Sequence, residues 1–382
     1  MPQIKPEMET FARIKVIGIG GSGKNALNHM MDAKVKGVDF IAVNTDSQDL
    51  HHSLAKKKIH IGKNLTKGLG AGMNPEIGKR AAEETKEEIQ EAIKGGDMVF
   101  IAGGEGGGTG TGAAPVVAKT SKELGILTIA VVTKPFSFEG QQRSRLAEAG
   151  IDELRKSVDA IIIIPNDKLL TSISKETTAK QAFIMCDEVL KQAVEGISDL
   201  ITTPGTIGNI DFADIRAVLE NAGSALMGIG YASGENRATE AAKGAINSPL
   251  LDISIHGAKS VLFSIAGSDD LTMFEIQDAA KIITESVDPN AKIIFGTVHD
   301  EKLKKGEIKV TVVAAGFPDA GQKKSLFENK PFSAKLPDTK TEKTQDEKNT
   351  GAPTETVTVP VVNAEEEDWG AVPAFLRRSK LK

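Results

Sequence analysis

A run of ten residues dominated by glycine constrains the fold of this chain more than any other stretch. Residues 103–112 contain seven glycines and two threonines and directly follow the apolar residues 98–102. Glycine loses more backbone entropy on folding than any other residue, so such a loop needs a compensating gain. The usual gain is close approach of backbone N–H groups to an anion, helped by the positive end of a following helix. Because Pro115 suits the start of a helix, we expect a phosphate-binding loop here rather than a flexible linker.

A second glycine loop lies near the beginning of the chain. The pattern G-x-G-x-x-G at residues 18–23 is typical of dinucleotide-binding proteins, in which Asp46 could contact a ribose. Lys24 nearly completes a P-loop, but Asn25 stands where that motif needs Ser or Thr to hold Mg²⁺. Neither motif explains the richer loop at residues 103–112. Two anion-binding loops at one edge of a sheet favour a single polyphosphate over a dinucleotide.

Short apolar segments alternate with longer amphipathic ones in the first half of the chain. We expect strands at residues 13–17, 39–43, 98–102, 127–133 and 160–165, and helices at 26–33, 75–94 and 144–157. Strands that are apolar on both faces and alternate with helices indicate a parallel sheet covered on both sides. Ligands bind at the carboxyl ends of such strands, where both glycine loops are expected.

A long helix is expected to connect this unit to a second α/β unit. It runs from Thr178 to about Ile201 and breaks at residues 203–205. The second unit contains no glycine loop of the same kind. We expect its helices at residues 211–221, 237–246 and 273–287, and its strands at 224–232, 260–266, 293–299 and 308–314.

The pattern changes again after Pro318, where charged residues and threonines replace large apolar ones. Such a composition buries too little surface to fold alone, so we expect a disordered linker. The last residues contain the only tryptophan and have the composition of a short docking peptide. The predicted divisions are a leader (1–11), a nucleotide-binding domain (12–177), a central helix (178–205), a second α/β domain (206–318), a linker (319–366) and a docking peptide (367–382).

Composition narrows the partners and the compartment. A net charge of −5 without a basic stripe argues against nucleic acid as a partner. One cysteine, Cys186, excludes an internal disulfide and suits a reducing compartment. No apolar run approaches the roughly 20 residues of a membrane helix, so we expect a cytoplasmic protein without membrane insertion. The histidines do not form a metal site, and we expect His51, His52 and His60 in a polar, lysine-rich loop.

Residues 106–112 (GGGTGTG) resemble the signature of tubulin-type GTPases. With the motifs around them, the chain resembles the FtsZ family of bacterial division proteins from about Ile14 to Phe317 and again in the last dozen residues. The resemblance implies a tubulin/FtsZ-like α/β fold and a GTPase that polymerises head to tail into the cell-division ring. It also implies GTP or GDP with Mg²⁺, the metal being held mainly by phosphates and not by dedicated protein ligands.

The resemblance assigns the nucleotide site. Asn44 and Asp46 would lie near the metal-bound phosphates, residues 71–75 would sense the γ-phosphate, and Phe183 and Asp187 would bind the guanine. From the residues alone, Phe183 is better explained as a core aromatic. The residues implied to bind nucleotide are Gly20, Gly21, Ser22, Gly23, Lys24, Asn25, Asn44, Asp46, Ala71, Gly72, Gly106, Gly107, Gly108, Thr109, Gly110, Thr111, Thr133, Glu139, Arg143, Asn166, Phe183 and Asp187.

A pair of carboxylates begins the second unit. Asp211 and Asp214 share one face of a helix's first turn, where N-capping and the helix dipole explain them equally well. In the family, this loop completes the nucleotide site of the next subunit. The resemblance therefore implies that Asp211 and Asp214, with Asn209, orient the water that attacks the γ-phosphate.

Two residues depart from the family pattern. Glu105 stands where the family usually has Met, and Lys24 where it usually has a small residue. A carboxylate beside a triphosphate is unfavourable unless it is paired or points away, so we hypothesise an ion pair between them. Two alternatives remain open: a nucleotide-binding scaffold that hydrolyses GTP poorly, and a dinucleotide-dependent enzyme.

The C-terminal peptide is similar to the segment with which FtsZ proteins bind membrane tethers and regulators of division. The resemblance therefore implies division proteins as partners, besides the chain itself, and a location at the division site. The residues implied to bind these partners are Val372, Pro373, Phe375, Leu376, Arg377 and Arg378.

Overall fold

The computed structural model describes residues 12–170, 176–203, 210–248, 255–268, 270–300 and 303–317. All of them belong to one compact unit. The predicted leader, linker and docking peptide lie outside the described residues, and so does Asn209. Among the described helices, none combines the length and apolar character that crossing a membrane requires.

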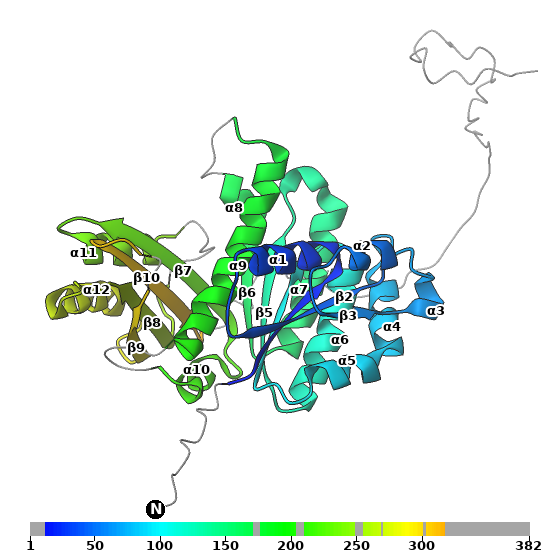
Figure 1. Ribbon diagram of the computed structural model, residues 1–382, viewed down its shortest axis with the longest axis horizontal. Coiled ribbons are helices and arrows are strands. Elements are labelled where there is room, and N and C mark those ends of the chain that lie inside the picture. Colours follow the sequence, from blue (N-terminus) through cyan, green and yellow to red (C-terminus); the bar gives the residue numbers. More distant parts are fainter. Residues whose placement is uncertain are drawn as a thin grey trace, which may run out of the picture. The chain divides into compact units, whose positions relative to one another are not determined.

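Ten strands of the described residues form one mixed sheet in the order β3-β2-β1-β4-β5-β6-β7-β10-β8-β9 (Figure 1). The first six strands in this order are parallel, which confirms the predicted parallel sheet. They are β3 (Lys57–His60), β2 (Val38–Asn44), β1 (Ile14–Ile19), β4 (Met98–Gly104), β5 (Leu127–Lys134) and β6 (Ala160–Pro165).

The second half of the sheet continues from β6. β7 (Gly223–Ser233) joins β6 in parallel through three residue pairs, beginning with Ala160 opposite Gly223. β10 (Glu307–Ala315) is antiparallel to both β7 and β8 (Ser260–Gly267), and β9 (Lys292–His299) is parallel to β8. The start of β7 therefore lies beside the amino end of β6.

Helices cover both faces of the parallel strands. α1 (Gly20–Asp32), α9 (Ala179–Thr202) and α10 (Phe212–Leu219) contribute side chains to one apolar core. The other face packs against α4 (Pro75–Glu84), α5 (Lys86–Ile93), α6 (Thr109–Glu123) and α7 (Gln141–Ser157). The remaining helices are α2 (Ser47–His51), α3 (Lys63–Thr66), η1 (Ser137–Glu139), α8 (Asn166–Leu170), α11 (Arg237–Ile246) and α12 (Met273–Glu285).

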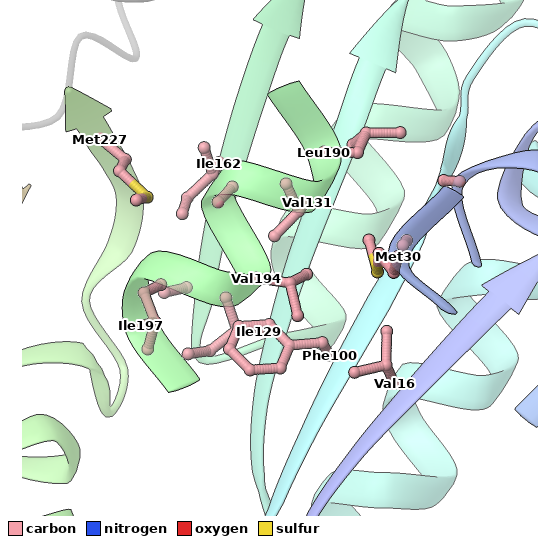
Figure 2. Close-up of a cluster of buried hydrophobic side chains, with 14 of the residues drawn as sticks. Val16, Met30, Phe100, Ile129, Val131, Ile162, Leu190, Val194, Ile197 and Met227 are labelled. Atoms are coloured by element: carbon pink, nitrogen blue, oxygen red, sulfur yellow. The ribbon is translucent and has the colours of Figure 1, made fainter. Parts of the chain in front are cut away.

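The apolar run of β4 explains why both faces are covered. Successive side chains of a strand point to opposite faces, so a continuous apolar strand contributes to two cores. Phe100 packs in the core beneath α9, whereas Val99 and Ile101 pack beneath α6. Figure 2 shows the first core, where Leu190 and Val194 of α9 lie close to the strands.

The long helix predicted from Thr178 is confirmed. Thr178 caps α9, because its hydroxyl accepts a hydrogen bond from the Gln181 backbone N–H at 3.3 Å. The Gln181 side chain accepts from the backbone N–H of Thr178 at 2.8 Å. These reciprocal bonds satisfy N–H groups that a helix leaves unpaired in its first turn.

Three predicted elements were wrong in detail. The helix predicted at residues 75–94 is two helices, α4 and α5, divided at Thr85. α6 begins at Thr109, so Pro115 lies inside the helix and not at its start. His60 belongs to the edge strand β3, where a loop was expected.

Candidate functional site

The two glycine loops meet at the carboxyl ends of β1 and β4. A Cβ atom placed on Gly20 would lie 3.3 Å from the backbone nitrogen of Gly110. Gly20 has a φ of +72° and Gly106 a φ of +94°, a left-handed conformation that glycine adopts without strain. The structure therefore places both predicted phosphate-binding loops side by side.

Several of these glycines serve packing and not ligand access. A Cβ on Gly23 would lie 2.6 Å from the carbonyl oxygen of Ala102, and one on Gly112 would lie 1.9 Å from that of Pro75. These contacts fix α1 against β4 and α4 against α6. Gly107 differs from them, because a Cβ there would have no heavy atom within 4 Å. The open space beside Gly107 is where a ligand can approach the backbone.

A comparison of two alanine substitutions separates these roles. We expect Gly112→Ala to destabilise the fold by roughly 1–3 kcal/mol, because the added methyl group overlaps the backbone of α4. Gly107→Ala should leave the melting temperature nearly unchanged but weaken nucleotide binding at least tenfold by filling the open space. Thermal unfolding and nucleotide titration measure the two effects. Equal losses of stability in both variants would contradict this division.

Side chains from several elements surround a pocket of about 210 Å³ beside the loops. Eight predicted nucleotide-binding residues line it: Ser22, Asn25, Thr133, Glu139, Arg143, Asn166, Phe183 and Asp187. Gly104, Glu105, Pro135 and Cys186 complete the lining and were not in the predicted set. Burial raises the pKa of the Cys186 thiol to about 12, so this thiol stays protonated, as expected of a packed cysteine.

Unpaired polar atoms concentrate in this pocket. Among the described residues, four buried side-chain atoms lack a hydrogen-bond partner. Three of them belong to pocket residues, namely Glu105 Oε2, Arg143 Nε and Asn166 Oδ1. Buried polar groups are nearly always hydrogen-bonded, so such a concentration marks a site that a polar ligand completes.

Phe183 is not the core aromatic that its sequence context suggested. Its side chain is 46% exposed and lies edge-to-face against Phe136, with ring centroids 5.4 Å apart. One turn further along α9, burial raises the pKa of Asp187 to about 6, while the charges of His29 and Lys24 oppose that rise. An accessible ring and a carboxylate on one helix face suit a planar base with adjacent N–H donors.

Arg143 and Glu139 form an ion pair across the pocket wall, with Nη1 and Oε2 2.9 Å apart. The other oxygen of Glu139 accepts a hydrogen bond from the Phe136 backbone at 2.9 Å, which fixes the carboxylate. Nε of Arg143 is buried and has no partner among the described residues, so protein groups do not satisfy the guanidinium completely.

Asp49 is a site residue that the sequence did not reveal. Its Oδ1 lies 2.6 Å from Lys24 Nζ, and its Oδ2 accepts a hydrogen bond from Asn44 Nδ2 at 2.8 Å. Asp46 caps α2 by accepting from the Asp49 backbone N–H at 2.9 Å. This network ties the first glycine loop to the end of β2. Its only signal in the sequence was the closeness of Asp49 to Asn44 and Asp46.

The hypothesised ion pair between Lys24 and Glu105 was wrong. Lys24 pairs with Asp49, and the Glu105 carboxyl is buried against Gly150 of α7, where an added Cβ would lie 2.6 Å from Oε2. Glu105 therefore packs against α7 instead of pairing with Lys24.

The loop at residues 71–75 approaches the second glycine loop. A Cβ on Gly108 would lie 2.9 Å from the Ala71 side chain, which is buried. Gly72 has a φ of +56°, and a Cβ there would meet nothing within 4 Å. Thr109 is fixed from a third direction, because its hydroxyl lies 2.7 Å from that of Thr45 at the end of β2.

Asp211 and Asp214 cap α10 and lie away from this pocket. Asp211 Oδ1 accepts from the Asp214 backbone N–H at 2.8 Å, and Asp214 Oδ2 accepts from the Asp211 backbone N–H at 3.3 Å. α10 leads into β7, whose start pairs with the amino end of β6. The glycine loops follow the carboxyl ends of β1 and β4. α10 therefore lies at the opposite end of the parallel strands, beside their amino ends (Figure 1).

Two models of known protein families match this chain. Residues 13–174 match the Tubulin/FtsZ family, GTPase domain, and residues 223–318 match the FtsZ family, C-terminal domain. The chain belongs to the FtsZ family. It therefore carries the GTPase domain of tubulin-like cell-division proteins and binds guanine nucleotides. The dinucleotide-dependent enzyme considered from the first glycine loop is thereby excluded.

Solved structures show the same relationship. An FtsZ from M. jannaschii, solved as an empty dimer, shares 47% sequence identity and superposes with a TM-score of 0.76, covering 81% of this chain and 89% of that chain. CetZ2 from Haloferax volcanii, solved as a GTPγS-bound protofilament, is 20% identical with a TM-score of 0.70 and covers 80% of this chain and 94% of that one. The second match shows the fold alone.

Proposed function

We propose that this protein hydrolyses GTP within head-to-tail filaments of the cell-division ring, with each active site completed between adjacent subunits. The observation that carries the proposal is the separation of two half-sites. The pocket and glycine loops lie at the carboxyl ends of the parallel strands, and the carboxylates of α10 lie at their amino ends. Subunits stacked head to tail would bring the pocket of one subunit next to the α10 carboxylates of its neighbour.

We expect the nucleotide to lie in the pocket in one orientation. The polyphosphate would lie along the backbone of Gly20–Gly23 and Gly106–Gly110, where N–H groups and the positive ends of α1 and α6 favour negative charge. The ribose would lie beside Glu139 and Arg143. Phe183 would stack on the guanine, and Asp187 would accept its N1–H and N2–H hydrogen bonds.

Mg²⁺ would accompany the triphosphate. Asn44 and Asp46 lie at the end of β2 near the first loop and offer the oxygen ligands that Mg²⁺ prefers. Among the described residues, no group of three or more His, Cys, Asp or Glu side chains is placed to hold a metal. The phosphates would therefore supply most of the coordination, and the ion would offset charge that develops during hydrolysis.

The aspartates of α10 would act on the nucleotide of the neighbouring subunit. In a filament, Asp214 and Asp211 would orient the water for in-line attack on the γ-phosphate. Both can perform this role while capping α10, because a carboxylate accepts more than one hydrogen bond. A contact between unlike faces that does not close into a ring builds a filament. The FtsZ from M. jannaschii that is 47% identical to this chain was solved as a dimer, which supports self-association.

The concentration dependence of turnover tests the shared site. We expect negligible GTP hydrolysis below a threshold protein concentration and a linear rise above it, measured with Mg²⁺ as phosphate release. A rate per molecule that stays constant at all concentrations would mean a complete site in each monomer and would refute the proposal. Filaments without turnover would indicate a nucleotide-binding scaffold instead.

The guanine contact has a pH signature. Asp187 must be ionised to accept both guanine donors, and burial raises its pKa to about 6. Protonation of Asp187 alone should therefore lower the affinity for GDP by roughly tenfold between pH 7.5 and pH 5, because about nine-tenths of this carboxyl is protonated at the lower pH. Asp187→Asn should weaken GDP binding at both pH values and remove most of this dependence. Asp152→Asn, an exposed carboxylate on α7, is the matched control.

The C-terminal peptide would connect the filament to membrane tethers and regulators, through Val372, Pro373, Phe375, Leu376, Arg377 and Arg378. Aromatic and arginine side chains dominate many binding hot spots, and this segment contains both types. The linker before it would give the peptide reach. These contacts would place the filament in the cytoplasm at the division site.

A further inference from the structure

Glu105 is a buried acid that the proposed chemistry does not use. It lies between the end of β4 and the glycines of the second loop, and its side chain is 3% exposed. Oε2 has no hydrogen-bond partner among the described residues. The carboxyl fills a space that exists only because residue 150 is glycine, since a Cβ there would approach Oε2 to 2.6 Å.

No positive charge compensates this carboxyl within the described part of the chain. Arg143 of α7 pairs with Glu139 of η1 at 2.9 Å. Further along α7, Glu153 pairs with Lys79 of α4 at 3.5 Å. On α6 the facing group is the neutral Thr111. At the end of β5, the Thr133 carbonyl oxygen accepts a hydrogen bond from the Glu105 backbone N–H at 3.0 Å.

Among the described residues, the helices on the other side of the pocket bring no cation to this carboxyl either. Asp187 on α9 lines the same pocket, and the first loop on α1 contributes the neutral Ser22. Lys24, the cation of that loop, is held by Asp49 at 2.6 Å. Burial raises the pKa of Glu105 to about 7, and a hydrogen bond from the Thr111 hydroxyl opposes the rise.

The loop that carries Glu105 has little freedom to expose it. The Gly106 backbone N–H donates to Thr111 Oγ1 at 2.9 Å. A Cβ on Gly106 would lie 2.7 Å from the carbonyl oxygen of Arg143, so the loop is packed directly on α7. An ionised Glu105 would have to be hydrated, and hydration requires the loop to separate from α6 and α7. The neutral acid therefore holds residues 106–108 in place.

We propose that Glu105 is a positioning residue that carries a proton in the nucleotide-bound protein, so that nucleotide binding is coupled to proton uptake. This inference rests on the proposed guanine-nucleotide site. Phosphates held by Gly106–Gly108 add negative charge directly beside residue 105, which disfavours its ionised form. The proton thereby stabilises the loop conformation that binds phosphate.

The size of the coupling follows from the titration of one group. With a pKa of about 7 in the free protein, Glu105 is mostly ionised at pH 7.5, and a rise of about one unit on nucleotide binding would take up about half a proton. The direction of proton exchange distinguishes Glu105 from other titrating groups. Ionisation of Asp187 or of a nucleotide phosphate on binding would release protons, whereas Glu105 takes them up.

Calorimetric titration of the nucleotide-free, full-length protein with GDP at pH 7.5 tests this coupling. The binding enthalpy in Tris and in HEPES, which differ in ionisation enthalpy, gives the number of protons exchanged. We expect uptake of about half a proton by the wild type and close to none by Glu105→Gln. Glu153→Gln, which changes an exposed carboxylate on α7, should behave as the wild type.

The affinity provides a second readout that a merely structural role would not change. The Kd for GDP of the wild type should rise about sixfold between pH 6.5 and pH 8.5, and that of Glu105→Gln should stay flat. GDP binding by the wild type without proton uptake, or equal uptake by Glu105→Gln, would overturn this inference alone. Absence of GDP binding by the wild type would overturn the proposed function and the inference with it. Should Glu105→Gln not fold, Glu105→Met supplies the same comparison.

Discussion

Asp214→Ala should abolish the concentration-dependent hydrolysis of GTP while leaving GTP binding intact. The carboxylate lies at the amino ends of the parallel strands and the pocket lies at their carboxyl ends. Its loss therefore does not alter the pocket of its own subunit. Removal of a group that orients or polarises reactants typically lowers turnover by about 10²–10³-fold. Phosphate release at protein concentrations above the threshold measures the loss, and a GTP titration confirms binding.

The capping role of Asp214 requires a control. Asp214 accepts one hydrogen bond from the Asp211 backbone at 3.3 Å, so alanine also weakens the first turn of α10. Asp214→Asn keeps an acceptor for that bond but removes the charge. We expect Asp214→Asn to unfold like the wild type yet to hydrolyse GTP as poorly as Asp214→Ala. Recovery of turnover in Asp214→Asn would assign the effect to the cap and not to catalysis.

Mixing two inactive variants tests whether the site is shared. Asp187→Asn retains the α10 carboxylates but binds guanine poorly, and Asp214→Ala retains the pocket. In a random one-to-one filament, about one junction in four would join an intact pocket to an intact α10. The mixture should therefore regain roughly a quarter of the wild-type turnover. A mixture as inactive as its components, with filaments present, would contradict a site formed between subunits.

The position of the site was predictable because glycine is costly and apolar strands are easy to recognise. Glycines that follow a strand of residues such as Phe100 and Ile101 have few explanations besides close packing or ligand contact. The structure shows both. Gly112 packs against α4, and Gly107 faces open space, a difference that depends on neighbours distant in sequence.

Helix boundaries were harder to predict because tertiary contacts override local preference. Residues 109–112 begin α6 although they are two threonines and two glycines, which are poor helix formers. The glycine at 112 is required by packing, because a larger residue there would overlap Pro75. The break at Thr85 interrupts a run of good helix formers. The Thr85 hydroxyl donates to the Ala81 carbonyl at 3.2 Å and accepts from the Gly62 backbone N–H, a partner that the local sequence does not contain.

Side-chain direction explains the wrong ion pair. The sequence correctly placed Lys24 and Glu105 on adjoining loops, but adjoining backbones do not determine where long side chains point. Asp49 lies on a five-residue helix that has no amphipathic pattern to reveal it. Phe183 is a similar case, because its apolar character suggested burial, whereas its place near the start of α9 leaves the ring accessible.

Arg237→Ala should cause the largest loss of stability among substitutions outside the site. The guanidinium is 7% exposed and bonds Glu275 at 2.6 Å and Asp270 at 2.8 Å, joining α11 to the start of α12. Removing one partner of a buried ion pair typically costs about 3–5 kcal/mol, because the remaining charges lose their compensation. Calorimetric unfolding at pH 7 measures this cost. Arg13→Ala, which breaks the exposed pair with Asp97 at 3.4 Å, should cost less than about 1 kcal/mol.

The effect of Arg237→Ala should shrink in acid. The Ser268 hydroxyl and the Arg237 guanidinium lower the pKa of Asp270 to about 2, and the guanidinium also lowers that of Glu275. Carboxylates with lowered pKa values stabilise the fold at neutral pH and lose that contribution as pH falls from about 4 towards 2. The wild type and the variant should therefore converge in stability over this range. A difference that stays constant down to pH 2.5 would show that Arg237 stabilises α11 and α12 by packing and not by charge, because packing does not titrate.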